Sequence, residues 1–212
     1  PHRPSSVLFG ALGVEAAIAP APGALPAAVA AQAAGLSLIC PEACGPEAAW
    51  AGGELPIIAP ASLIQLINHF KGTQVLSRPA PGELVETAGI ADLNQVKGQE
   101  SAKRALEIAA AGHHNLLMVG PPGSGKSMMA ERLPGLLPPL SAAELLDVSM
   151  IHSVAGLLER GCLRRDRPFR SPHHSASMAA MVGGGRRARP GEASPAHQGR
   201  PFLDELPESH PP

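Results

Sequence analysis

Residues 115–133 read NLLMVGPPGSGKSMMAERL, which places an apolar run, a glycine-rich loop and a helix-forming segment in direct succession. The loop at 120–127 has the spacing of a phosphate-binding loop, with four residues between its outer glycines and Lys-Ser directly after them. Apolar residues 115–119 predict a short buried strand, and 128–133 predict a helix that ends before Pro134. Strand, loop and helix in this order predict an α/β fold around a phosphate site.

Each part of this loop has a task in holding a nucleoside triphosphate. Glycine has no Cβ and tolerates positive φ, so the backbone can approach the phosphates closely. The loop amides are expected to surround the β-phosphate at a helix N-terminus, where the helix dipole favours negative charge. We expect Lys126 to reach the β- and γ-phosphates, and the Ser127 hydroxyl to bind the bridging Mg²⁺.

The nucleotide-binding residues predicted on this basis are Gly120, Pro121, Pro122, Gly123, Ser124, Gly125, Lys126, Ser127 and Met128. The implied cofactors are ATP and Mg²⁺. The alternative interpretation is a Gly/Pro-rich turn that happens to contain Lys-Ser.

A pair of adjacent carboxylates near the C-terminus supplies the second half of such a site. Apolar Phe202 and Leu203 precede Asp204 and Glu205. We expect Asp204 to hold the Mg²⁺ together with Ser127, and Glu205 to polarise the attacking water. Glu205 and Lys126 are therefore the predicted catalytic residues. Without a phosphate loop upstream, the same acidic pair would be read as a solvated turn.

The first 72 residues show an α/β rhythm of their own. Short apolar runs predict strands at 7–10, 36–40 and 56–59. Helices are predicted at 25–35, where Gly35 forms the end, and at 62–72, where Ser62 begins the helix. The predicted domains are a partial N-terminal domain at 1–72, a Pro-rich linker at 73–97 and a nucleotide-binding domain at 98–212, which opens on a helix at 99–112.

The composition of the chain limits the compartment and the kinds of partner that we expect for this protein. The three cysteines suit a reducing, cytoplasmic compartment, and no metal is assigned to Cys40 and Cys44 because no second Cys or His pair lies near them. No stretch reaches about 18 uninterrupted apolar residues, so no membrane partner is expected. Aromatic residues make up only 2% of the chain, so stacking platforms for bases are scarce. The chain begins at Pro1 without Met, which suggests further sequence upstream.

Positive charge is concentrated in one segment. Residues 160–189 hold eight arginines and the single acid Asp166, although the whole chain has a net charge of −1. A phosphate-rich partner such as DNA would favour this Arg-rich segment (residues 160–189). Pairing of the arginines with a neighbouring acidic surface is the alternative.

Several further segments carry a family resemblance. They include Val-Lys-Gly-Gln at 96–99, the run 105–115, and the segments 136–140, 169–177, 183–185, 190–192 and 202–208. Together with the loop, they resemble the magnesium-chelatase-like AAA+ ATPases of bacteria, of the competence protein ComM and YifB type. Upstream, 23–28 and 41–43 resemble the end of that family's N-terminal domain.

The resemblance implies an incomplete three-layer P-loop AAA+ domain, preceded by part of a Lon-protease-like (ribosomal S5 domain 2-like) α/β domain. It also implies a ring-forming, usually hexameric ATPase that couples hydrolysis to movement on DNA, with ComM-like members acting in branch migration. On this interpretation the Arg-rich segment contacts DNA. His173 and His174 lie in a candidate substrate or pore contact, for which a structural turn is the alternative. No Ser-Lys protease pair can be placed, which disfavours proteolysis.

Two features depart from the family pattern. Arg200 and Pro201 stand inside the strand expected before Asp204, and proline removes a ladder donor, so we expect this strand to be short. After Glu208 the chain ends in Ser-His-Pro-Pro, whereas the family continues with apolar sequence. In the AAA+ sheet order, the strand at 115–119 lies between two later strands. We therefore expect it to lack ladder partners and the chain to turn over little ATP.

The sequence is compatible with three functions. The first is an ATP-driven DNA motor subunit, which DNA-stimulated hydrolysis would support. The second is a chelatase-type ATPase subunit that remodels a protein partner. The third is a non-catalytic nucleotide-binding fragment, which would bind ATP without hydrolysing it.

Overall fold

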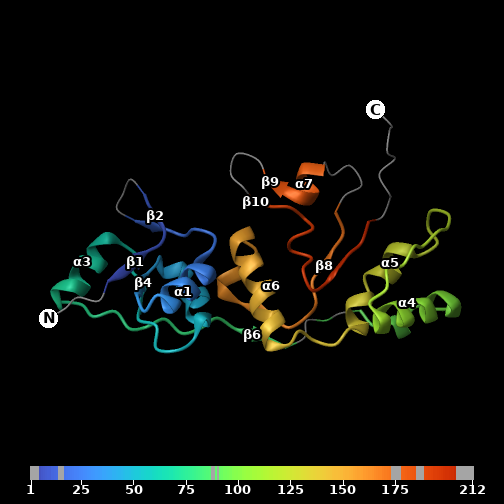
Figure 1. Ribbon diagram of the computed structural model, residues 1–212, viewed down its shortest axis with the longest axis horizontal. Helices are drawn as coiled ribbons and strands as arrows, with labels where there is room; N and C mark the ends of the chain where they lie inside the picture. The colour runs from blue at the N-terminus through green and yellow to red at the C-terminus, as the bar shows by residue number, and fades with distance from the viewer. Residues whose placement is uncertain are drawn as a thin grey trace. The chain divides into compact units, whose positions relative to one another are not determined.

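The computed structural model describes residues 5–13, 17–86, 89, 91–172, 178–184 and 189–203 (Figure 1). The chain divides into two compact units. The first unit comprises Pro1–Val85 and Ser149–Leu163, and the second comprises Glu86–Val148 and Arg164–Pro212. The class of fold is mixed α/β with parallel strands, as predicted.

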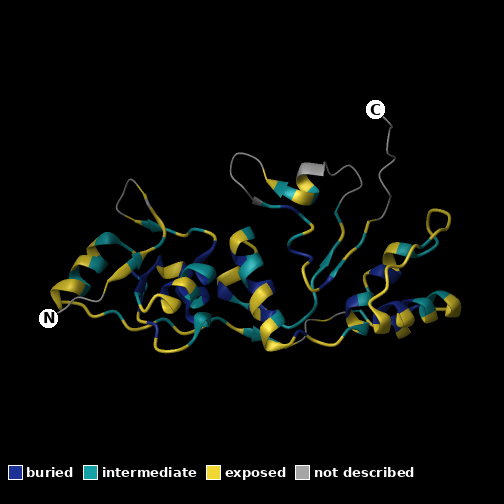
Figure 2. Ribbon diagram, in the orientation of Figure 1, coloured by how far each residue is buried: buried dark blue, intermediate teal, exposed yellow. Residues whose placement is uncertain are grey.

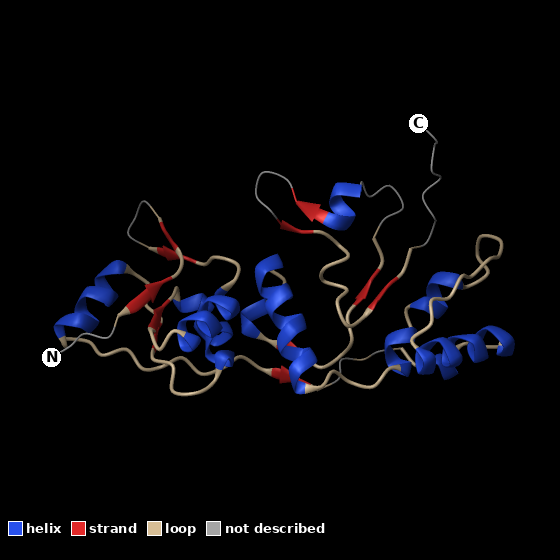
Figure 3. Cartoon of the chain, viewed as in Figure 1, coloured by secondary structure: helices blue, strands red, loops and turns tan. Residues whose placement is uncertain are grey.

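A three-stranded parallel sheet organises the first unit, in the order β1-β4-β5 (Figure 3). Its strands are β1 (Ser6–Leu8), β4 (Ser37–Ile39) and β5 (Ile57–Ile58). Leu38 pairs with both Val7 and Ile57, so the central strand β4 has a neighbour on each side and is fully buried. The three strands predicted for this region are confirmed, with shorter boundaries.

Helix α1 (Ala24–Ala33) provides much of the core of the first unit (Figure 2). Its residues Ala24, Ala28 and Ala31 are buried beside Leu38 of the sheet. Small alanine side chains allow helix and sheet to approach closely, which is how a chain with few aromatic residues fills its interior. The predicted helix at 25–35 is confirmed.

Helix α3 (Leu63–Lys71) has the predicted ends. Ser62 caps it through its Oγ, which accepts the backbone N–H of Gln65 at 3.4 Å, and Gly72 ends it with φ of 75°. Its apolar side chains Ile64, Ile67 and Phe70 are nevertheless exposed. The helical period was therefore a sound guide to secondary structure but not to burial.

The rest of the first unit consists of short elements. They are the antiparallel hairpin β2 (Ala11–Leu12) and β3 (Ile18–Ala19), the turns η1 (Glu42–Cys44), α2 (Gly45–Ala48), η2 (Ala49–Ala51) and η5 (Glu159–Gly161), and β6 (Leu84–Val85), which pairs with β7 (Leu163–Arg164).

The segment Ser149–Leu163 is an integral part of the first unit although it follows the phosphate loop in sequence. The buried Glu47 accepts hydrogen bonds at Oε1 from the backbone N–H of Leu25 and from the Ser153 hydroxyl. Trp50 Nε1 donates to the Gly161 carbonyl at 2.7 Å. The contacts with Ser153 and Gly161 join residues 106 and 111 positions apart, which local sequence patterns do not show.

The second unit is built mainly from helices. They are η3 (Leu93–Gln95), α4 (Glu100–Gly112), α5 (Lys126–Ala130), η4 (Leu133–Leu136) and α7 (Met178–Val182), with α6 (Ala142–Ala155) containing the boundary between the units. Leu93, Val96, Leu106 and Met129 form its buried core. This core packs α4 against α5, the helix that follows the phosphate loop. The predicted helix at 99–112 is confirmed, whereas the one predicted at 128–133 begins at Lys126 and ends at Ala130, and Pro134 lies inside η4.

The segment 115–119, predicted as a strand, has no β-structure assigned to it. Leu117 is 72% exposed and Val119 is 89% exposed. No described strand pairs with this segment, so the ladder hydrogen bonds that define a strand are absent. The prediction of a strand is therefore wrong for the described structure.

Two short strand pairs complete the second unit. β9 (Gly183–Gly184) lies antiparallel to β10 (Arg189–Pro190), and β8 (Phe169–Arg170) lies parallel to β11 (Arg200–Pro201). Two backbone N–H groups of the second segment donate toward β8: that of Arg200 to the Pro168 carbonyl, and that of Phe202 to the Arg170 carbonyl. Pro201 occupies the intervening position, where its missing N–H costs no bond to β8. The strand before Asp204 is short, as expected, but not for the expected reason: Arg200–Pro201 itself forms the strand, and Phe202 and Leu203 are not assigned to it.

A capping box begins α6 in the second unit. Glu144 Oε2 accepts the backbone N–H of Ser141 at 2.9 Å, and Ser141 Oγ accepts that of Glu144 at 3.4 Å. Glu144 Oε1 also accepts Nη2 of Arg167 at 3.0 Å. The Ser141 hydrogen bonds, followed by the Arg167 guanidinium, lower the pKa of Glu144 to about 2.

This lowered pKa makes a prediction for acid stability. The folded state holds Glu144 ionised, so its contribution is complete above the ordinary pKa of 4.5 and is lost as pH falls towards 2. Glu144→Gln is expected to flatten the pH dependence of unfolding within this window. Urea unfolding followed by circular dichroism at pH 2.5, 3.5, 4.5 and 6 would measure it. Asp147→Asn, an exposed acid of the same helix, is the control, and an equal effect of both variants would contradict the prediction.

Candidate nucleotide site at the phosphate loop

The loop at 120–127 combines left-handed glycines with backbone amides that lack partners. Gly123 and Gly125 have φ of 78° and 86°, a region that glycine adopts without steric cost. Within the described part of the chain, the amides of Gly123, Gly125 and Lys126 donate to no acceptor. Backbone donors of this kind favour an anionic ligand that accepts hydrogen bonds.

Lys126 begins α5 and folds back over the loop. Its Nζ donates to the carbonyl oxygens of Gly120 at 2.9 Å and Pro121 at 3.1 Å. These exposed carbonyls are weak partners for an ammonium group, so a phosphate could replace them at little cost. The lysine is therefore placed at the loop, where the sequence predicted it to act.

Ser124 carries a second unsatisfied group. Its Oγ is buried and, among the described residues, has no hydrogen-bond partner. A Cβ at position 120 would lie 2.9 Å from this oxygen, so Gly120 leaves the room that the Ser124 side chain occupies. A buried hydroxyl without a partner is expensive, which favours a ligand or water at this place.

A cavity of about 370 Å³ adjoins the loop. Its wall is formed by Gln99, Ala102, Ala105, Leu116, Leu117, Met118, Val119, Gly120, Pro121, Ser124, Lys126 and Met129. The lining is apolar on the side of α4 and polar at the loop. Gln99 was not among the predicted site residues, yet its Nε2 donates to the Ser124 carbonyl at 2.9 Å.

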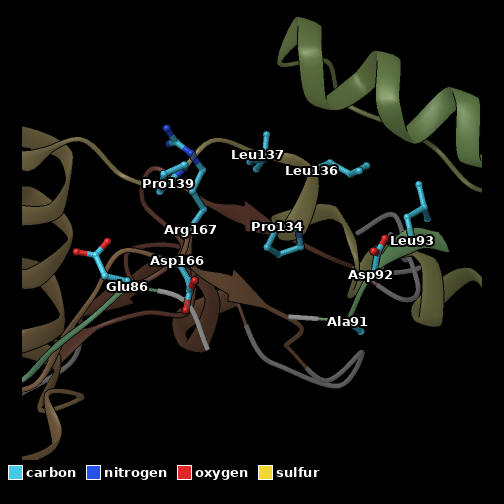
Figure 4. Close-up of a pocket in the computed structure, with 11 residues that line it drawn as sticks. Glu86, Ala91, Asp92, Leu93, Pro134, Leu136, Leu137, Pro139, Asp166 and Arg167 are labelled. Atoms are coloured by element: carbon cyan, nitrogen blue, oxygen red, sulfur yellow. The ribbon is translucent and has the colours of Figure 1, made fainter. Parts of the chain in front are cut away.

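A second cavity of about 320 Å³ lies elsewhere in the second unit (Figure 4). Its wall includes Glu86, Asp92 and Asp166 together with apolar residues, and no residue of the phosphate loop contributes to it. Asp92 Oδ1 accepts the backbone N–H of Asn94 at 2.9 Å, so this carboxylate already caps η3. Ser124, with its unsatisfied hydroxyl, and Lys126 line the first cavity and not this one.

Asp204 and Glu205 lie outside the described residues, as do His173 and His174. The predicted nucleotide-binding positions, Gly120–Met128, lie in one continuous loop and helix start. Among the described residues, no group of three or more His, Cys, Asp or Glu could hold a metal ion. Cys40 and Cys44 are buried, and burial raises the pKa of the Cys40 thiol to about 12.

The Arg-rich segment (residues 160–189) is partly neutralised by the protein itself. Three of its arginines form ion pairs: Arg164 with Asp166 at 3.7 Å, Arg165 with Glu86 at 3.4 Å, and Arg167 with Glu144 at 3.0 Å. In the described part of the chain, Arg160 and Arg170 have no ion pair. The alternative that these arginines pair with a neighbouring acidic surface is therefore realised for Arg165 and Arg167, whereas Arg164 pairs within the segment itself.

Comparison with known proteins shows the family to which this chain belongs. Residues 92–211, more than half of the chain, match the family model described as magnesium chelatase, subunit ChlI. The chain belongs to this family. Its match begins just before α4 and includes the whole phosphate loop.

The similarity of this magnesium chelatase family member to individual relatives covers almost the whole chain. The uncharacterized protein YifB of Escherichia coli (strain K12) is 46% identical over 202 residues, which is 95% of this chain and 40% of that protein. The competence protein ComM of Haemophilus influenzae is 42% identical over 193 residues, 88% of this chain and 37% of that protein. The chain is thus a magnesium-chelatase-like protein of the ComM and YifB type, and it spans about 40% of the length of these relatives.

A shorter similarity connects the family member to Lon proteases. The archaeal Lon protease of Halobacterium salinarum is 41% identical over 61 residues, 29% of this chain and 8% of that protein.

None of the described helices is long and apolar enough to cross a membrane.

Proposed function

We propose that this protein binds ATP with Mg²⁺ at the loop 120–127. The observation that carries the proposal is that, among the described residues, the amides of Gly123, Gly125 and Lys126 and the Ser124 hydroxyl have no partner. The Lys126 ammonium lies over the same loop. Gly120, Pro121, Pro122, Gly123, Ser124, Gly125, Lys126, Ser127 and Met128 would hold the nucleotide. Family membership supports the use of a nucleotide and Mg²⁺.

We further propose that the whole protein hydrolyses ATP, within a three-layer AAA+ domain that assembles into a hexamer in the cytoplasm. Ser127 and Asp204 would hold Mg²⁺, which when bound neutralises charge between the β- and γ-phosphates. Lys126 would stabilise the charge that develops on the γ-phosphate, and Glu205 would take a proton from the attacking water.

ATP affinity tests the binding proposal directly. Lys126→Ala is expected to weaken ATP binding roughly 10- to 100-fold in calorimetric titrations with Mg²⁺, because a charge-assisted contact to phosphate is lost. Lys71→Ala removes an exposed lysine of the first unit and is expected to leave the affinity unchanged. Equal ATP affinity of wild type and Lys126→Ala, with both proteins folded, would overturn the proposal.

The role of Glu205 separates hydrolysis from binding. In the whole protein, Glu205→Gln is expected to bind ATP as tightly as wild type but to release at least roughly 100-fold less phosphate, because the general base is missing. Binding of ATP with no phosphate release by the wild type would instead support a non-catalytic nucleotide-binding protein.

The coupled task that we propose is remodelling or branch migration of DNA. Similarity to a protein named for competence supports it, as do Arg160 and Arg170, whose guanidinium groups have no ion pair among the described residues. Stimulation of ATP hydrolysis by branched DNA, weakened by Arg170→Ala and by higher salt, is expected. Hydrolysis that does not respond to DNA would favour the remodelling of a protein partner, as in a chelatase subunit.

A further inference from the structure

Gln99 adopts a backbone conformation that its residue type disfavours. Its φ is 57° and its ψ is 40°, the left-handed region, and it directly follows Gly98 with φ of 69°. A side chain with a Cβ costs roughly 1–2 kcal/mol in this region, where glycine would be free of strain. A non-glycine residue held in such a conformation suggests that its side chain has a task.

The Gln99 side chain does not serve the helix that it precedes. It stands at the N-cap position of α4 but makes no side-chain capping bond there. Its Nε2 instead donates to the carbonyl oxygen of Ser124 at 2.9 Å, 25 residues further along the chain. Among the described residues, the hydrogen bond of this side chain therefore goes to the phosphate loop and not to α4.

This contact determines the direction of the next amide. The carbonyl of Ser124 and the N–H of Gly125 belong to one planar trans peptide, so they point in opposite directions. The bond holds the Ser124 carbonyl toward Gln99, and the Gly125 N–H consequently points away from Gln99. Gly125 is one of the residues whose amide has no acceptor in the described part of the chain.

We propose that Gln99 is a positioning residue that orients the Ser124–Gly125 peptide so that the Gly125 amide can donate to a nucleoside triphosphate. The inference rests on the proposed function of the loop. It adds a residue outside the loop to the binding machinery. The contact is exposed and the net value of such a bond is modest, so the expected loss of ATP affinity is roughly three- to tenfold.

Two substitutions of Gln99 separate positioning from a structural role. Gln99→Gly removes the amide but relieves the left-handed strain, so thermal stability is expected to stay equal or rise while ATP affinity falls. Gln99→Glu keeps the shape but replaces the donor by a carboxylate that repels both the Ser124 carbonyl and a phosphate. It is expected to lower the affinity roughly tenfold or more. Gln95→Glu, at an exposed position nearby, controls for the added charge.

The measurement is calorimetric ATP titration with Mg²⁺, paired with a thermal unfolding curve for each variant. Lower affinity at unchanged or higher stability in Gln99→Gly supports positioning. Affinity equal to wild type in that variant overturns the inference while leaving the proposed function intact. If wild-type binding does not depend on Lys126, the proposed function fails first and the inference falls with it.

Discussion

Replacing Glu47 by alanine is expected to lower the free energy of unfolding of the first unit by roughly 2–5 kcal/mol. Glu47 is 8% exposed, and its Oε1 accepts both the backbone N–H of Leu25 and the hydroxyl of Ser153, which is 1% exposed. Without the carboxylate both donors remain buried and unsatisfied, and each costs roughly 1–3 kcal/mol. The lost side chain also leaves a void beside α1.

Trp50 provides the measurement because it is the single tryptophan of the chain and lies in the same unit. Its fluorescence during urea unfolding reports the stability of the first unit alone. Glu54→Ala, which removes an exposed carboxylate of that unit, is expected to shift the unfolding free energy by less than about 0.5 kcal/mol. A Glu47→Ala midpoint equal to that of Glu54→Ala would show that the network contributes nothing.

Gly161→Ala is expected to destabilise the same unit by roughly 2–5 kcal/mol. Gly161 has φ of +68°, which costs an alanine roughly 1–2 kcal/mol. A Cβ there would also lie 2.5 Å from the backbone nitrogen of Glu47 and 2.7 Å from the carbonyl carbon of Pro46. Backbone atoms cannot rotate away as a side chain can, so the overlap adds roughly 1–3 kcal/mol.

Gly35→Ala is the matched control for this substitution. Gly35 has nearly the same φ, +66°, but a Cβ at that position would meet no atom within 4 Å. It is expected to show only the conformational cost of roughly 1–2 kcal/mol. The difference between the two variants in the Trp50 unfolding curve measures the overlap alone. Equal destabilisation would mean that Ser149–Leu163 does not pack against Glu47 in solution as it does here.

Both substitutions test whether the first unit needs a segment that follows the phosphate loop. The contacts of Glu47 with Ser153 and of Trp50 with Gly161 draw Ser149–Leu163 into this unit. Expression of the first 85 residues alone would leave the Glu47 carboxylate without its Ser153 donor and Trp50 without its acceptor.

Local features of the fold were readable from the sequence because they depend on neighbouring residues. Ser62 and Gly72 mark the ends of α3 through bonds and φ values that each residue sets within its own turn. Gly123, Gly125 and Lys126 predict a phosphate loop for the same reason, since the spacing of glycines and lysine determines which backbone conformations are possible.

Tertiary structure alone decided the roles of residues whose partners lie far along the chain. Segment 115–119 is apolar enough for a strand, yet a strand exists only where another strand supplies its ladder bonds. Glu47 joins a buried hydrogen-bond network only because folding brings Ser153 beside it. In the same way, Gln99 contacts the loop only because folding brings Ser124 beside it. The sequence by itself therefore determined the family of the chain and predicted a phosphate loop within it, because both depend on residues close together along the chain. The three-dimensional structure decided which distant residues contact that loop and hold the first unit together.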